Sequence, residues 1–207
     1  MRINNSTGFP NWSQLKNVDA PMTECNVTAF IDAAQSAGYD VMAARKSSDP
    51  NKRPPDDLYE FLHSDPECLA LRDKLSPGTP PNELMEVLAL GGRKWLNTEK
   101  VVWTYAMPLQ DILTAVRRGS CGVVHGRYQA ISAHGPVTID HMNAVVGAEW
   151  DDISGALTGF IIDDPYGDYR HAYTSHLGDD IVMPLPDIQS YLKGATPDRK
   201  DIILISR

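Results

Sequence analysis

The chain has 207 residues, a length typical of one domain, and we predict that residues 1–207 form a single unit. Hydrophobic residues make up 42% of the chain and charged residues 22%, which excludes a fully disordered protein. The net charge is −8, so the chain lacks the excess of basic residues that is typical of nucleic-acid-binding proteins. No apolar run reaches the ~18–20 residues of a membrane span, and residues 1–12 lack the apolar core of a secretory signal. Synthesis in the cytoplasm without a signal peptide is therefore expected.

The first part of the chain is predicted to be an arm followed by a mainly helical region over 25–118. Residues 1–24 are polar and turn-rich and predict an irregular arm. The run CNVTAFIDAAQSA, residues 25–37, repeats apolar residues at helical spacing, with Thr23 as a candidate N-cap and Gly38 directly after the helix. A Pro-rich loop over 46–57 is expected next. Further helices are predicted over 58–75, from residue 83 to Gly91–Gly92, and over 108–119.

Residues 119–207 are predicted to be mainly sheet. Short runs rich in Val and Ile, separated by turn residues, predict strands over 121–128, 141–150 and 157–165, with two more in DDIVMPL and DIILISR. Regular spacing of short strands is typical of an antiparallel sheet. A helical half followed by a sheet half indicates the α+β class.

The three cysteines, Cys25, Cys68 and Cys121, form no CxxC pair, so a zinc ribbon or thioredoxin-like redox site is not expected. Cys25 falls in the first turn of a predicted helix, where free N–H groups and the helix dipole favour a thiolate. The alternative is that Cys25 is an ordinary buried cysteine, as we predict for Cys68 and Cys121.

A nucleophilic cysteine needs a base, and the base needs an orienting group. His141 opens the predicted strand 141–150, while Asp163 and Asp164 end the next one. Antiparallel pairing of these strands brings His141 beside the two aspartates. Because side chains alternate along a strand, only one of the aspartates can face His141. The alternatives are that His141 is a surface histidine at a strand edge and that the segment DDPYGD, with Asp163 and Asp164, is an ordinary polar turn.

Two further features bear on the chemistry. Gln14 in the predicted arm is a candidate side-chain donor to an oxyanion, beside the backbone N–H of Cys25. His171 and His176 have a spacing compatible with a metal, but no third ligand follows at motif spacing, so no metal is expected.

Together, the segments SQLKNVDAPMTECNVTAF, DHMNAVVGAEW and GFIIDDPYGDY resemble papain-like cysteine peptidases of the bacteriocin-processing (double-glycine peptidase) type and their phage and bacterial relatives. The resemblance implies that Cys25 is the nucleophile and His141 the general base. It also implies that Asp164, directly before Pro165, orients His141 and that Gln14 is the oxyanion donor. Asp163 remains the alternative third member of the triad.

The resemblance further implies a cysteine-dependent amide hydrolase with the papain-like fold and without metal or cofactor. Its phage relatives indicate an endolysin-like enzyme that cuts peptide bonds of peptidoglycan and reaches the cell wall through a separate holin. Two alternatives stay open. One is a cysteine peptidase acting on a protein substrate, and the other is a non-catalytic phage structural or binding protein on the same fold. The oligomeric state and the scissile bond are left open.

Overall fold

A computed structural model describes residues 1–207 except 7, 9–10, 19–23, 133 and 177. Its α-helices are α1 (Cys25–Ser36), α2 (Val41–Ala44), α3 (Pro54–Ser64), α4 (Pro66–Leu75), α5 (Met85–Leu96), α6 (Leu109–Arg117) and α7 (Leu185–Tyr191). Its short 3-10 helices are η1 (Gln14–Lys16), η2 (Pro81–Glu83) and η3 (Tyr169–His171). Its strands are β1 (Arg2–Asn4), β2 (Val101–Pro108), β3 (Cys121–Ser132), β4 (Gly135–Trp150), β5 (Leu157–Asp163), β6 (Ile181–Pro184) and β7 (Arg199–Ile205).

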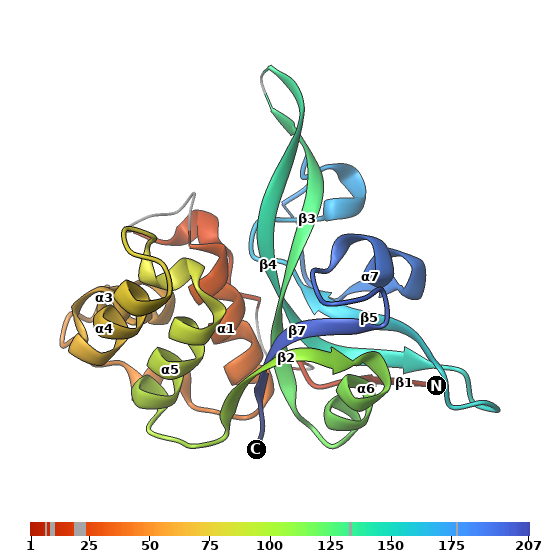
Figure 1. The fold of residues 1–207 in the computed structure, drawn as a ribbon, viewed down its shortest axis with the longest axis horizontal. Helices are drawn as coiled ribbons and strands as arrows, with labels where there is room; N and C mark the ends of the chain where they lie inside the picture. Colours follow the sequence, from red (N-terminus) through yellow and green to blue (C-terminus); the bar gives the residue numbers. More distant parts are fainter. Residues whose placement is uncertain (7, 9–10, 19–23, 133, 177) are drawn as a thin grey trace.

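The strands form one antiparallel sheet in the order β2-β7-β3-β4-β5-β6, with β1 paired to β4. Helices α1, α3 and α5 lie on one side of the sheet, and α6 and α7 lie on the other (Figure 1). Alternation along the strands builds both cores, since Ile161 packs with the α1 side and Ile162 with the α6–α7 side. The predicted combination of helices with an antiparallel sheet is therefore confirmed.

Helix α1 is the central element of the helical side and packs against β3 and β4. It begins at Cys25 and is followed by Gly38 at φ +95°, a left-handed conformation that glycine adopts without strain. The predicted cap Thr23 lies outside the described residues, and Glu24 stands at the N-cap without a side-chain capping bond. In this first turn the backbone N–H of Val27 donates to Oδ1 of Asn26 at 2.9 Å.

Several predicted boundaries in the N-terminal half are wrong. The arm over 1–24 contains strand β1 and the 3-10 helix η1, and the loop over 46–57 ends early because α3 begins at Pro54. Proline fits a first helical turn, where its missing N–H has no partner to lose. Helix α5 continues past Gly91–Gly92 to Leu96, because these glycines leave room for Leu62 and Phe30 to pack on the helix. Strand β2 was not predicted within the helical region.

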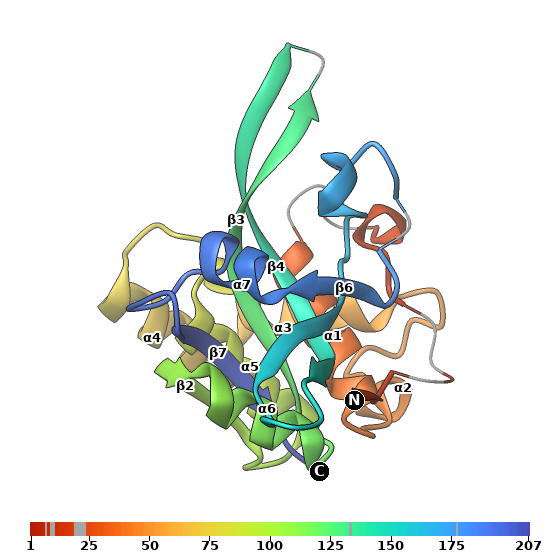
Figure 2. The same ribbon diagram turned by 90° about the vertical axis from the view of Figure 1, so that its right-hand side faces the viewer.

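In the C-terminal half, β3 and β4 are longer than predicted and α7 was not predicted. β3 extends to Ser132 and β4 begins at Gly135, so the ladder between them runs from Gly122↔Val145 to Ser132↔Gly135. Its outer half, residues 127–132 and 135–139, is a twisted two-stranded arm that projects from the sheet (Figures 1 and 2). His141 therefore lies inside β4, opposite Gly126, and not at the start of a strand.

Among the described residues, no helix is both long and apolar enough to cross a membrane.

Candidate active site

Cys25 is the first residue of α1 and is partly buried, whereas the other two cysteines are fully buried. Its neighbours along the helix are buried, so the thiol is fixed at the helix start beside a cavity of about 560 Å³. Cys68 and Cys121 are fully buried, and burial raises the pKa of each thiol to about 12. The thiol with the position required of a nucleophile is Cys25.

His141 and Asp164 form a buried pair. Nε2 of His141 lies 2.7 Å from Oδ1 of Asp164, and the side chains are 4% and 0% exposed. The same Oδ1 accepts hydrogen bonds from the backbone N–H groups of Tyr166 (3.0 Å) and Gly167 (3.2 Å). Because Nε2 is engaged by the carboxylate, Nδ1 is the ring nitrogen left for Cys25.

The electrostatics favour a charged imidazole at this position. Burial alone lowers the pKa of His141, but the Asp164 carboxylate and Cys25 outweigh it and raise the pKa to about 10. An imidazolium next to the cysteine stabilises the thiolate in turn. The arrangement therefore places a protonated imidazole beside Cys25 at neutral pH.

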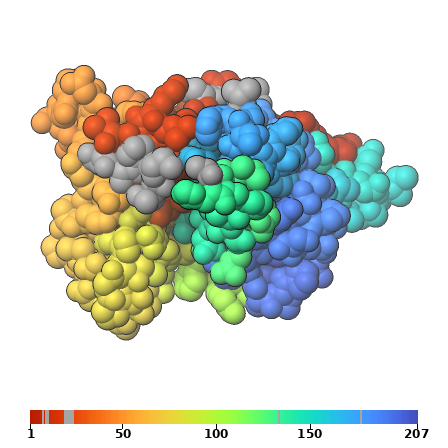
Figure 3. Space-filling view, turned by 90° about the horizontal axis from the view of Figure 1, so that it is seen from above, coloured from red at the N-terminus to blue at the C-terminus, as the bar shows by residue number. Residues whose placement is uncertain are grey.

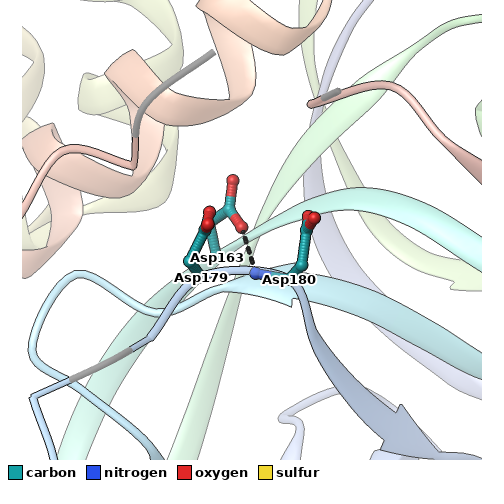
Figure 4. Close-up of side chains that lie close together, drawn as sticks. All are labelled: Asp163, Asp179 and Asp180. Carbon is teal, nitrogen blue, oxygen red and sulfur yellow. Dashed lines mark hydrogen bonds between the residues drawn. The ribbon is translucent and has the colours of Figure 1, made fainter. Parts of the chain in front are cut away.

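Asp163 points away from His141 and belongs to a different cluster. Its carboxylate accepts a hydrogen bond from the backbone N–H of Asp180 at 2.9 Å, and oxygens of Asp163, Asp179 and Asp180 lie within 4.8 Å of one another (Figure 4). Burial is the main cause that raises the pKa of Asp163 to about 7. Asp32 of α1 is a further acidic neighbour. Strand alternation thus separates the two aspartates, and Asp164 is the one that faces His141.

Gln14 lines the same cavity as Cys25 and His141. It is buried in η1, and its backbone N–H donates to the carbonyl oxygen of Pro165 at 3.0 Å. This bond ties the segment carrying Gln14 to the turn that carries Asp164. Gln14, Cys25 and His141 all line the cavity, so the structure brings the four residues selected from the sequence to one place.

The rest of the cavity wall comes mainly from the β3–β4 arm. Six of the lining residues belong to the arm or its base, namely Ala130, Ile131, Ser132, Val137, Ile139 and Asp140. Viewed from above, the arm in green stands between the helical side in orange and yellow and the C-terminal residues in blue (Figure 3). The arm gives the cavity an apolar wall, and Glu83 of η2 lines it as well.

An aromatic shell behind His141 was not predicted. The ring of Tyr173 lies 5.5 Å from that of His141 in an edge-to-face arrangement, and Tyr128 lies 6.2 Å away. Tyr166, in the turn that follows β5, lines the cavity with Tyr173. No sequence motif marks Tyr173, because its place depends on the loop after β5 folding back to the arm.

The remaining histidines are placed elsewhere or carry other contacts. Nδ1 of His171 lies 2.9 Å from Asp168, and Nδ1 of His176 lies 3.0 Å from the carbonyl oxygen of Tyr166. His125 lines the cavity, and burial followed by the charge of Lys193 lowers its pKa to about 4. A neutral His125 has no carboxylate bond comparable to that of His141.

No protein-family model matches the sequence, and no curated protein is significantly similar to it. Among solved structures, the chain is similar to one from Bacillus anthracis described as a "putative C39-like peptidase". The two share 15% sequence identity with a TM-score of 0.53, over 100% of this chain and 98% of the other. At 15% identity this similarity concerns the fold alone.

Proposed function

We propose that this protein is a cysteine-dependent amide hydrolase with a Cys25–His141–Asp164 triad. The observation that carries the proposal is the buried His141–Asp164 hydrogen bond, with His141 lining the same cavity as a cysteine at a helix N-terminus. The fold likeness to a described peptidase supports the same reading.

Each residue then has a definite task in acyl transfer. His141 accepts the Cys25 proton at Nδ1, and the thiolate attacks the amide carbonyl carbon. Gln14 and the backbone N–H of Cys25 stabilise the oxyanion of the tetrahedral intermediate. The imidazolium donates its proton to the leaving amine, and water then hydrolyses the thioester with His141 as the base. Asp164 keeps the ring oriented and stabilises its charge throughout.

The proposed substrate class is the peptide part of peptidoglycan, which follows from the resemblance of the sequence to phage relatives. A protein substrate is the second candidate, because the apolar wall formed by Ile131, Val137 and Ile139 suits any extended peptide with apolar side chains.

The test compares wild type with Cys25→Ala on purified peptidoglycan and, in parallel, on unfolded casein. The expected result is release of new amines from peptidoglycan by wild type alone, with mass spectrometry of the fragments naming the bond. Release from casein alone would move the substrate to proteins. No release from either substrate, with the protein folded and Cys25 reduced, would refute the proposed hydrolase.

A further inference from the structure

Tyr173 stands in a strained and tightly fixed segment. Both Ala172 and Tyr173 have positive φ angles, 48° and 61°, in a region that residues with a Cβ adopt rarely. The segment is held by hydrogen bonds from the backbone of Ile131 to the carbonyl oxygen of Ala172 (3.1 Å) and from the backbone of Tyr173 to that of Asp168 (3.2 Å). Strain of this kind persists where the surroundings impose it, and it is common at functional sites.

The segment directs Tyr173 at the buried pair. Tyr173 is 5% exposed, lines the cavity with Cys25, and meets the His141 ring at 5.5 Å and 78°. The Asp164 carboxylate lies near the hydroxyl, although the two groups are not hydrogen-bonded. Burial and then this carboxylate raise the pKa of Tyr173, so the hydroxyl keeps its proton and stays a donor.

Oδ2 of Asp164 and the hydroxyl of Tyr173 both lack a hydrogen-bond partner among the described residues. Oδ1 of Asp164 already accepts from His141, Tyr166 and Gly167, whereas buried Oδ2 has no hydrogen-bond partner among the described residues. The hydroxyl of Tyr173 is likewise buried without a hydrogen-bond partner in the part of the chain that is described. One of these groups is a donor and the other an acceptor, and buried polar groups are normally paired; hydrogen bonds at such sites are often long before substrate binds.

We propose that Tyr173 is a positioning residue of the triad whose hydroxyl donates a hydrogen bond to Oδ2 of Asp164. This inference rests on the proposed function. The bond favours the ionised carboxylate, which in turn keeps the proton on His141 and the thiolate on Cys25. A phenylalanine would fill the same space and keep the ring contact with His141, but it would leave Oδ2 unpaired.

The test follows alkylation of Cys25 by iodoacetamide against pH, which requires no knowledge of the substrate. In this reaction the thiolate sulfur bonds to the methylene carbon and iodide leaves, so the rate reports the thiolate. Cys68 and Cys121 are fully buried, and Cys25→Ala gives the background. In wild type, a Cys25 thiolate paired with the His141 imidazolium should be alkylated at a substantial rate even at acidic pH. The pH range over which this rate falls towards lower pH is the acid limb of the profile.

In Tyr173→Phe we expect the acid limb to move up by about one pH unit, which is roughly a tenfold lower rate at a fixed pH on that limb. Tyr191→Phe is the matched control, because it removes a hydroxyl from a ring stacked on Tyr128 in the same shell but outside the cavity. Thermal unfolding of each variant accompanies the rates.

An acid limb in Tyr173→Phe that coincides with wild type, both proteins being folded, would overturn the positioning role and leave the proposed function intact. An equal shift in Tyr191→Phe would also overturn it, since the effect would then belong to the shell in general. A wild-type profile that follows an ordinary thiol with pKa near ~8.5 would instead overturn the ion pair, and the proposed function would fail with it.

Discussion

Replacing Asp164 by alanine is expected to remove most of the activity while leaving Cys25 and Gln14 in place. The side chain of Asp164 is 0% exposed and that of His141 is 4% exposed, so water cannot replace the lost partner of the imidazolium. Breaking a buried pair in this way costs about 3–5 kcal/mol. That energy corresponds to a loss of roughly two to nearly four orders of magnitude in kcat/KM.

Asp163→Ala is the matched control, since it changes the neighbouring aspartate of the same strand end. Asp163 contacts Asp180 and not His141, so we expect kcat/KM at neutral pH to stay within about threefold of wild type. Amine release from the cleaved substrate measures both variants, with circular dichroism to show that each is folded. Equal losses in the two variants would refute the assignment of Asp164 as the orienting group.

Three further predictions follow from the site and the core. The pKa of Asp163 is raised from 3.8 to about 7, so the folded state holds a proton that the unfolded state has released. The free energy of unfolding should therefore fall by up to roughly 4 kcal/mol as the pH rises from about 4 to 7. Urea titrations at several pH values measure this fall, which should be smaller in Asp163→Asn because the amide does not titrate. Gln14→Ala should lower kcat about 10²–10³-fold with little change in the alkylation rate of Cys25, whereas an unchanged kcat would exclude Gln14 as oxyanion donor. Gly92→Ala should lower stability by about 1–3 kcal/mol, seen as a lower Tm, because the added Cβ would overlap the buried Phe30 ring.

The sequence could predict the meeting of His141 with an aspartate because that depends only on local rules. Two adjacent strands joined by a short turn pair antiparallel, and the register Ala144↔Asp163 leaves His141 and Asp164 just beyond the end of β5. Period-two alternation then sends Asp163 towards α1 and Asp164 towards His141. These rules use the order of residues along one hairpin and need no long-range contact.

What the sequence could not predict depends on contacts between distant segments. Gly91 and Gly92 look like a helix end, and only their packing against Leu62 and Phe30 shows why α5 continues through them. Strand β1 and the 3-10 helix η1 likewise exist because β4 and the Pro165 turn offer them backbone partners. Local patterns carry no trace of such partners, so the polar arm around them was the natural expectation.

The same contrast explains why the proposed catalytic residues could be identified from the sequence and their environment could not. Cys25, His141 and Asp164 are chemically distinctive residues: Cys25 begins α1, His141 lies within β4, and Asp164 directly follows β5. Tyr173 is an ordinary tyrosine whose position is set by the arm, through the bond from Ile131 to Ala172, and by the loop that follows β5. The length of β3 and β4 beyond the sheet therefore does two things at once. It supplies an apolar wall for the cavity, and it fixes the segment that presents a hydroxyl to the unpaired oxygen of Asp164. The two proposals together thus make the shape of the cavity and the protonation of the proposed triad depend on the same hairpin.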